Sequence, residues 1–305
     1  MISYSGLLQK LNEKGLTKTA LTRELGISSR TVAKIGRGEK IADHVLEKMA
    51  VFFGCSAGEL CQIISDNILL QTLRDEKNIR MPGGLYHELQ VRMTYNSNHI
   101  EGSKLSEDQI RLIFETNTVD VGEGIPVDDI IETANHFKCI DMIIDNAKYK
   151  LTEKFIKQLH YTLKSGTSDS RKDWFNVGEY KKLPNEVGGK ETAKPEDVAT
   201  KIKALLKDYN QKEEHTLEEI VDFHYSFETI HPFQDGNGRV GRLIMFKECL
   251  KNNIVPFIID EDLKMFYYRG LSEWNNEKGY LTDTCLAAQD KFKKYLDYFK
   301  VPYIE

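Results

Sequence analysis

The stretch HPFQDGNGRVGRL, residues 231–243, gathers one imidazole, one carboxylate, three glycines and two arginines into thirteen positions. Glycine-rich loops with basic side chains are typical of phosphate sites. No Gly-Lys-Ser/Thr closes this stretch, so it is not a P-loop, and no strand-like apolar run leads into it, as a dinucleotide fingerprint requires. The residues therefore predict a phosphate site of another kind.

Two helices are expected to flank this stretch. Residues 216–230 carry apolar side chains at helical spacing, and Pro232 prevents that helix from continuing, so His231 should lie near its C-terminal end. Helical spacing resumes over residues 237–250. Phe233, the apolar residue between the helices, is expected to anchor the loop to the core.

The loop and the start of the second helix have the groups that bind phosphate. Gly236, Asn237 and Gly238 can turn successive backbone N–H groups toward one anion, and the positive end of the helix adds to this attraction. Arg239 and Arg242 are three positions apart in the first turn, so their side chains are expected over the same spot.

Two further side chains of the loop can take part in a reaction. Asp235 offers a hard oxygen ligand for Mg²⁺, which binds one or two carboxylates together with phosphate oxygens. His231 is the only group of the loop that acts as a base near neutral pH, so it can accept the proton of a hydroxyl that attacks phosphorus. The residues therefore predict transfer of a nucleotide fragment to an alcohol.

The stretch resembles the signature of the Fic family, His-x-Phe-x-Asp/Glu-Gly-Asn-Gly-Arg-x-x-Arg, at all eight specified positions. The resemblance implies a Fic-type helical bundle over residues 85–300 and transfer of AMP from ATP to a Ser, Thr or Tyr hydroxyl of a target protein, with Mg²⁺. It also implies a role for each signature residue: His231 as the catalytic base, Asp235 as the metal ligand, and Phe233, Gly236, Asn237, Gly238, Arg239 and Arg242 as nucleotide-binding residues.

The peptide SNHIEG places a carboxylate unfavourably. Ser97 and Glu101 are four positions apart on one helical face, and Gly102 ends that helix, so Glu101 faces the negative end of the helix dipole. On these residues alone, a solvated glutamate without a role is the simpler interpretation. Many Fic proteins carry Ser/Thr-x-x-x-Glu-Gly/Asn in an inhibitory helix, and the resemblance implies such a helix near residues 94–102, with Glu101 paired to Arg242.

The N-terminal segment predicts a helix-turn-helix. Gly26 permits a left-handed turn after a short helix, Ile27 plugs that turn, and a second helix with a polar face follows. Residues 1–63 carry nine basic and six acidic side chains, a net charge of +3, and resemble Cro-like repressor DNA-binding domains. A helical docking module that does not touch DNA is the alternative. The candidate DNA-binding residues are Ser29, Arg30, Thr31 and Lys34.

Two other segments bear on the site. Residues 175–189, FNVGEYKKLPNEVGG, alternate in polarity, contain turn signals and resemble the β-hairpin flap that aligns a target by strand pairing, although the histidine that often follows it is missing. Residues 265–281 resemble the helix that closes the nucleotide pocket, with Tyr268, Leu271 and Trp274 on one face. Simple core packing is the alternative for these three side chains.

The whole chain of 305 residues is expected to be mostly α. A helix-turn-helix domain at 1–63, a polar connector at 64–84 and a Fic domain at 85–305 are predicted. The net charge of −5 argues against a nucleic-acid coat over the whole chain. Five scattered cysteines favour reduced thiols, and no apolar run reaches the roughly 18 residues of a membrane-spanning helix, so a cytoplasmic protein is expected.

Three functions remain open on these observations. The first is a protein adenylyltransferase that Glu101 holds inactive. The second is an enzyme that removes AMP, with Glu101 orienting a water molecule, and the third is a DNA-binding regulator whose Fic domain senses nucleotide. The expected partners are ATP, a target protein and, through residues 1–63, DNA, while other nucleotide donors and a homo-oligomer also remain open.

Overall fold

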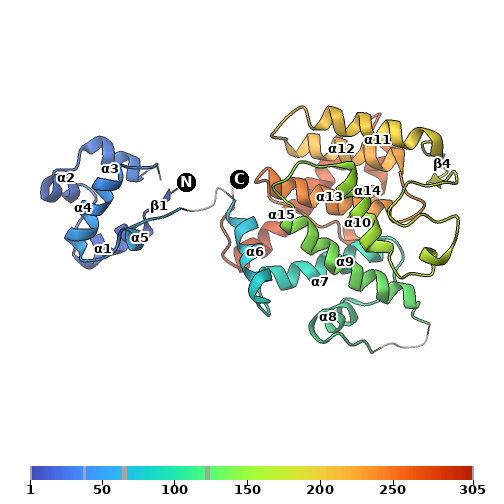
Figure 1. Cartoon of the computed structure of the whole chain (residues 1–305), viewed down its shortest axis with the longest axis horizontal. Coiled ribbons are helices and arrows are strands. Elements are labelled where there is room, and N and C mark those ends of the chain that lie inside the picture. The colour runs from blue at the N-terminus through green and yellow to red at the C-terminus, as the bar shows by residue number, and fades with distance from the viewer. Residues whose placement is uncertain (1, 37–38, 64–66, 121–123, 304–305) are drawn as a thin grey trace. The chain divides into compact units, whose positions relative to one another are not determined.

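The computed structural model describes residues 2–36, 39–63, 67–120 and 124–303. The chain divides into two compact units, Met1–Ile68 and Leu69–Glu305, and each is described by itself (Figure 1). Among the helices of the described ranges, none combines the length and the apolar character needed to cross a membrane. Each of the five cysteines carries a free thiol, as the sequence predicted.

The smaller unit is a bundle of short helices with a two-stranded antiparallel sheet. Its elements are β1 (Ile2–Ser3), α1 (Ser5–Glu13), α2 (Ala20–Leu25), α3 (Ser29–Gly36), α4 (Asp43–Phe53), α5 (Ala57–Leu60) and β2 (Gln62–Ile63). The turn after α2 is left-handed at Gly26, with φ 62°, and Ile27 behind it is buried. The predicted helix, glycine turn and second helix are therefore present, and α4 closes their core.

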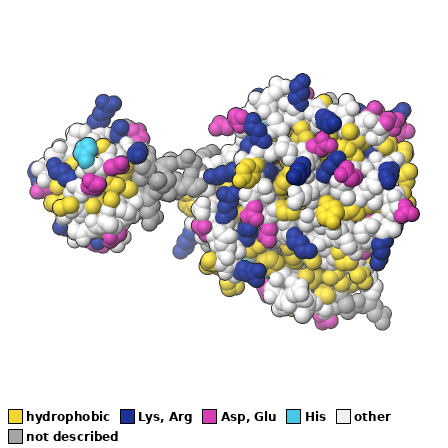
Figure 2. Space-filling model, viewed as in Figure 1, with side chains coloured by type: hydrophobic (Ala, Val, Ile, Leu, Met, Phe, Trp, Pro, Cys, Tyr) yellow, Lys and Arg dark blue, Asp and Glu magenta, His cyan; other side chains and the backbone are white. Residues whose placement is uncertain are grey.

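The larger unit is a helical bundle with one small β-hairpin, which confirms the predicted mostly α fold. Its elements are α6 (Ile68–Ile79), α7 (Leu85–Ile100), α8 (Glu107–Thr116), α9 (Val127–Asp145), α10 (Glu153–Lys164), η1 (Asp169–Arg171), β3 (Glu186–Val187), β4 (Lys190–Glu191), α11 (Pro195–Tyr209), α12 (Leu217–Ile230), α13 (Asn237–Lys251), α14 (Glu261–Glu273) and α15 (Gly279–Tyr298). On the face shown in Figure 2, basic and acidic side chains of this unit are interspersed.

Helix α13 lies in the middle of this bundle, in contact with α7, α9, α10 and α12 (Figure 1). Thirteen of its fifteen residues are buried, so its polar side chains need partners inside the core. Lys247 contacts Glu248 at 2.7 Å and donates to the carbonyl oxygen of Tyr149 at 2.6 Å, and the Tyr209 hydroxyl donates to Glu248 at 3.1 Å. These contacts fix the helix whose first turn forms the site.

The segment predicted as a connector, residues 64–84, contains a helix in the structure. Residues 64–66 lie outside the described residues, and α6 follows them. Leu69 and Leu73 of α6 are buried in the core of the larger unit. The polar residues of this segment form the exposed face of an amphipathic helix, which composition alone does not distinguish from a linker.

The β-hairpin is shorter and begins later than the predicted stretch 175–189. Strands β3 and β4 pair on either side of Gly188 and Gly189, and the residues before them form a loop. Phe175, which read as part of an alternating strand, is buried against the ring of His160. The alternation thus reflects a loop with apolar anchors rather than a strand.

Candidate active site

His231 follows the last residue of α12 and has a left-handed backbone, with φ 51°. Its N–H donates to the carbonyl oxygen of Phe227 at 2.9 Å, and its Nδ1 lies 3.3 Å from the carbonyl oxygen of Glu228. Because a carbonyl oxygen only accepts, Nδ1 carries the proton and Nε2 is left as the acceptor. Burial, with the charge of Lys181, lowers the pKa of His231 to about 4, so the imidazole is neutral at physiological pH.

Phe233 and Asn237 hold the shape of the loop. The Phe233 side chain is fully buried, and its ring stacks on His160 with centroids 3.9 Å apart. The Asn237 side chain accepts from the Phe233 N–H at 2.8 Å and donates to the Phe233 carbonyl oxygen at 2.9 Å. Both side chains, and the backbone N–H and carbonyl oxygen of Phe233, are therefore occupied within the loop.

The loop passes directly into the N-terminus of α13. Gly236 precedes this helix with φ 81°, a conformation that favours glycine. The first N–H groups of a helix have no partner within it, so this turn is suited to an anion. A Cβ at Gly238 would lie 2.3 Å from Oε1 of Glu101 and 2.9 Å from Nη1 of Arg242. Glycine at 238 thus lets an ion pair approach the helix start closely.

The predicted contact between Glu101 and Arg242 is present. Nη2 of Arg242 donates to Oε1 of Glu101 at 2.7 Å and to the carbonyl oxygen of Ser97 at 2.9 Å, while Nε donates to the Ser97 hydroxyl at 3.1 Å. Glu101 caps the C-terminal end of α7, and Gly102 follows with φ 94°. Arg242 is buried, so charge-assisted hydrogen bonds of this kind are strong.

Arg239 faces a different acidic group, so the two arginines do not converge on one spot as expected. Its Nη1 is paired with Glu132 of α9, and its Nη2 lies 3.2 Å from Oδ2 of Asp235. The reason is that α13 is surrounded by other helices, so Arg239 meets an acid of α9 while Arg242 meets the end of α7.

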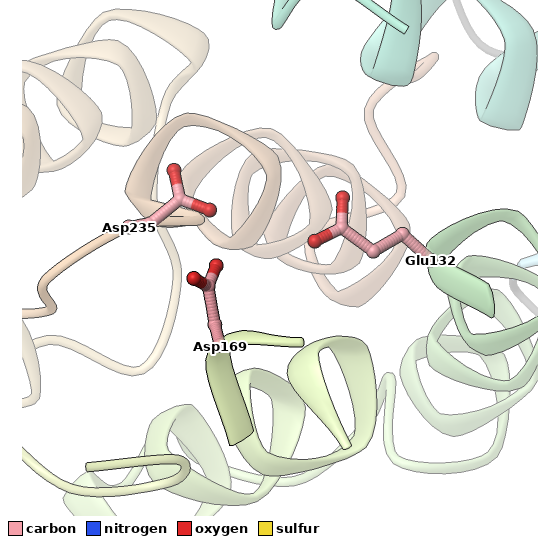
Figure 3. Close-up of side chains that lie close together, drawn as sticks. All are labelled: Glu132, Asp169 and Asp235. Atoms are coloured by element: carbon pink, nitrogen blue, oxygen red, sulfur yellow. The ribbon is translucent and has the colours of Figure 1, made fainter. Parts of the chain in front are cut away.

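Glu132, Asp169 and Asp235 form an acidic cluster beside the loop (Figure 3). One oxygen of each carboxylate lies within 4.8 Å of the others. Lys164 of α10 contacts all three: it lies 2.7 Å from Asp235 and 2.9 Å from Asp169, and it is also paired with Glu132. Burial opposes the ionised form of Asp235, but Arg239 and Lys164 outweigh it and hold the pKa of Asp235 below its ordinary value.

Glu132, Lys164 and Asp169 were not predicted as site residues, because they come from separate segments and follow no local motif. Glu228 was not predicted either; it lies one turn before His231 and only 12% of its side chain is exposed. Oε2 of Glu228 lies 3.8 Å from Nδ1 of His231, and burial raises the pKa of this carboxyl to about 8. The i,i+3 spacing within a helix was the available signal for this residue.

The segment that leads to the hairpin is fastened to the catalytic loop. The backbone N–H of Lys181 donates to the carbonyl oxygen of Pro232 at 2.9 Å. The ammonium of Lys181 lies 3.5 Å from the carbonyl oxygen of Ile230. The Asn185 side chain donates to the carbonyl oxygen of Phe233 at 3.0 Å. These contacts bracket His231, so the position of the hairpin and that of the imidazole are linked.

Three side chains of the predicted pocket-closing segment, Tyr268, Leu271 and Trp274, have different surroundings in and after α14. Trp274, which follows the helix, is buried and stacks on Tyr225 with centroids 5.4 Å apart, and Leu271 packs against the same core. Core packing, the alternative from the sequence, therefore describes these two. The Tyr268 hydroxyl instead donates to the carbonyl oxygen of Ile100 at 3.2 Å, so it meets the end of α7 beside Glu101.

Protein-family models match segments of both units. Residues 150–249 match the model of the Fic/DOC family, and residues 7–66 match that of the Cro/C1-type helix-turn-helix DNA-binding domain. The chain thus contains a Fic domain, preceded by a helix-turn-helix domain.

Curated relatives carry the name protein adenylyltransferase Fic. The chain is 26% identical to that of Aedes aegypti over 244 residues, which is 79% of this chain and 46% of the relative. It is 29% identical to that of Drosophila melanogaster over 181 residues, which is 58% of this chain and 36% of the relative. The chain thus spans less than half the length of these relatives.

Solved structures agree on the fold. A Fic-domain-containing signalling protein from Bacteroides thetaiotaomicron is 27% identical, with a TM-score of 0.57 over 75% of this chain and 90% of that one. A Fic-1 structure from C. elegans is 16% identical, with a TM-score of 0.59 over 97% of this chain and 96% of that one, which supports the fold alone.

Proposed function

We propose that this protein is an adenylyltransferase that moves AMP from ATP to a hydroxyl of a target protein and that Glu101 holds it inactive. The observation that carries the proposal is the arrangement around the start of α13. The neutral imidazole of His231, with Nε2 as acceptor, precedes a helix N-terminus suited to phosphate. Arg242, one of the two arginines at this helix start, is paired with the carboxylate of Glu101. The curated relatives' name supports the same reaction.

In this reaction the oxygen of the target hydroxyl attacks the α-phosphorus of ATP. Nε2 of His231 takes the hydroxyl proton as the new P–O bond forms, and the bond between the α-phosphorus and pyrophosphate breaks. Backbone N–H groups at the start of α13 and the guanidinium of Arg242 stabilise the negative charge on the phosphates. While Arg242 is paired with Glu101, it cannot bind the outer phosphates. ATP then binds with its α-phosphorus misplaced for in-line attack by the target hydroxyl.

Asp235 fits the role of ligand for Mg²⁺. Its Oδ2 is engaged by Lys164 and Arg239, but half of the side chain is exposed, so Oδ1 is left for one cation. Magnesium normally takes only one or two protein carboxylates and completes its shell with phosphate oxygens and water. When bound, such an ion would neutralise charge on the phosphates, while Asp235 would fix its place beside the loop.

The test is to incubate the purified chain with ATP labelled in the α-phosphate and to follow covalent label on the protein itself and on proteins of a cell extract. The Glu101→Gly variant is expected to label protein, and its His231→Ala derivative is not. Label from ATP carrying the isotope only in the γ-phosphate would contradict AMP transfer and indicate a kinase-type reaction.

Removal of AMP is a second candidate, because the Glu101 carboxylate acts electrostatically on the pKa of His231 and is partly exposed. A carboxylate in that position can orient water toward a phosphorus–oxygen bond. AMP-modified target incubated with wild type separates the candidates: release of AMP that Glu101→Gly abolishes would favour removal.

For the smaller unit we propose DNA binding through α3. Ser29 and Arg30 are exposed, and Thr31 and Lys34 are partly exposed, while Ile35 on the other side of the helix is buried. Side chains displayed in this way suit contacts with phosphates and base edges. Gel retardation at low salt tests the proposal, and a full-length chain that retards no DNA would favour a protein-docking role.

A further inference from the structure

The acidic cluster of Glu132, Asp169 and Asp235 already contains a positive charge. Lys164 is 2% exposed, and its Nζ contacts one oxygen of each carboxylate, at 2.7 Å for Asp235 and 2.9 Å for Asp169, with Glu132 as the third partner. An ammonium that binds three carboxylates at once occupies the point on which these oxygens converge.

Without that charge the cluster would have the composition of a metal site. Three carboxylates with oxygens within 4.8 Å of one another offer the hard ligands that Mg²⁺ and Mn²⁺ prefer. Carboxylates this close repel one another when ionised and need a counter-ion. Arg239 supplies part of the compensation from the side of α13, where it pairs with Glu132 and Asp235.

We propose that Lys164 takes the place of a resident metal ion in this cluster, so that the resting protein binds no divalent cation there and the metal enters only with the nucleotide, at the remaining oxygen of Asp235. The second half of this inference rests on the proposed function; the first half does not. The Lys164 side chain is buried, and its Nζ lies 5.5 Å from the centre of the Phe175 ring. This cation–π contact adds to the three ion pairs that fix the position of the ammonium.

The experiment titrates the full chain with Mn²⁺ in the absence of nucleotide and counts bound ions by electron paramagnetic resonance. Wild type is expected to bind none at the cluster, and Lys164→Met is expected to bind one per chain. The double variant Lys164→Met/Asp169→Asn should lose that ion. The matched control is Lys172→Met, because Lys172 contacts the other oxygen of Asp169 at 2.6 Å from the solvent side and should leave the count at none.

Addition of α,β-methylene ATP, which does not release pyrophosphate, is expected to bring one Mn²⁺ per chain into wild type and into Asp169→Asn, but not into Asp235→Asn. Binding of one Mn²⁺ by wild type without nucleotide, abolished by Asp169→Asn, would overturn the inference. A folded Lys164→Met that binds no Mn²⁺ would do so too, and if that variant does not fold, the wild-type titration still decides. Because no step of the cation count requires transfer, its result is independent of whether labelled AMP reaches a protein.

Discussion

Glu101 Oε1 and Arg242 Nη2 lie 2.7 Å apart, although 141 positions separate the two residues in the chain. The pair joins the C-terminal end of α7 to the first turns of α13, and Gly238 leaves the space for it. One side chain of the anion site is thus withheld from ligands by the protein's own carboxylate.

Glu101→Gly should raise AMP incorporation roughly 10²-fold, because it frees Arg242 to place the phosphates in line for attack. Incorporation of labelled AMP at saturating ATP measures the effect. Ser97→Ala is the matched control: it removes the hydroxyl contact but keeps the carboxylate, so activity should stay near that of wild type. Equal incorporation by Glu101→Gly and wild type would refute inhibition, and Arg242→Ala should not activate, since the phosphate grip is lost as well.

His231→Ala should abolish transfer, because loss of a general base typically costs about 10²–10⁴-fold. ATP binding should be nearly unchanged, since the start of α13 rather than the imidazole contacts the phosphates. Calorimetric titration with ATP and label incorporation, both in the Glu101→Gly background, separate the two effects. Full activity in His231→Ala would remove His231 from the mechanism.

The pH profile of the released enzyme should show a low acid limb. Burial, with the charge of Lys181, lowers the pKa of His231 to about 4, and loss of the Glu101 charge lowers it further, so kcat/KM of Glu101→Gly should be flat near neutral pH and fall only at pH 4 or below. Lys181→Met should move this limb toward the ordinary histidine value of about 6.5. Lys182→Met, the exposed neighbour, should leave it in place, and an unmoved limb in Lys181→Met would contradict the assignment.

Glu228 should destabilise the fold at alkaline pH. Its folded pKa is raised to about 8, so the folded chain keeps a proton that the unfolded chain releases above about 4.5. This contribution is complete below pH 4.5 and is lost as pH rises through 8. Glu228→Gln should therefore gain stability relative to wild type as pH rises from 6 to 8, at about 1.4 kcal/mol per pH unit, with no further gain above pH 8. Urea unfolding followed by the fluorescence of Trp174 and Trp274, both in the larger unit, measures it.

Two truncations test the division of the chain. Removal of residues 1–63 should abolish DNA retardation and leave AMP transfer by the Glu101→Gly variant intact, because the smaller unit has its own core. Removal of residues 1–84 should in addition destabilise the larger unit, since it deletes Leu69 and Leu73 from the core. Equal unfolding midpoints of the two truncated chains would show that α6 contributes nothing to that core.

The sequence predicted best what depends on neighbours in the chain. The end of α12 before His231 and the glycine turn at Gly26 follow from proline, glycine and helical spacing, which act over a few residues. The pairing of Glu101 with Arg242 was reachable only because a family resemblance supplied the long-range partner.

What the sequence did not predict depends on packing between distant segments. Lys164 meets Glu132 and Asp169 only because α9, α10 and η1 converge, and no spacing rule links those segments. For the same reason Arg239 was expected beside Arg242, whereas each is drawn to an acid on a different helix. Helix α6 within the predicted connector was not recognised, because its polar face dominates the composition of that segment.

The burial of α7 sets how tightly the protein can be switched off. Eleven of its sixteen residues are buried, so the helix cannot leave as a unit without opening the core, whereas the Glu101 side chain is about one-third exposed and can turn away alone. Rotamer changes of exposed side chains take picoseconds to nanoseconds. A hydrogen bond to a charged group contributes about 1.5–3 kcal/mol, which corresponds to a released fraction of roughly 1–10%. The resting protein should therefore have a constant low basal activity. A ligand that binds the Glu101 carboxylate in its turned-out rotamer would raise this activity in proportion to the ligand concentration, without a large rearrangement of the fold.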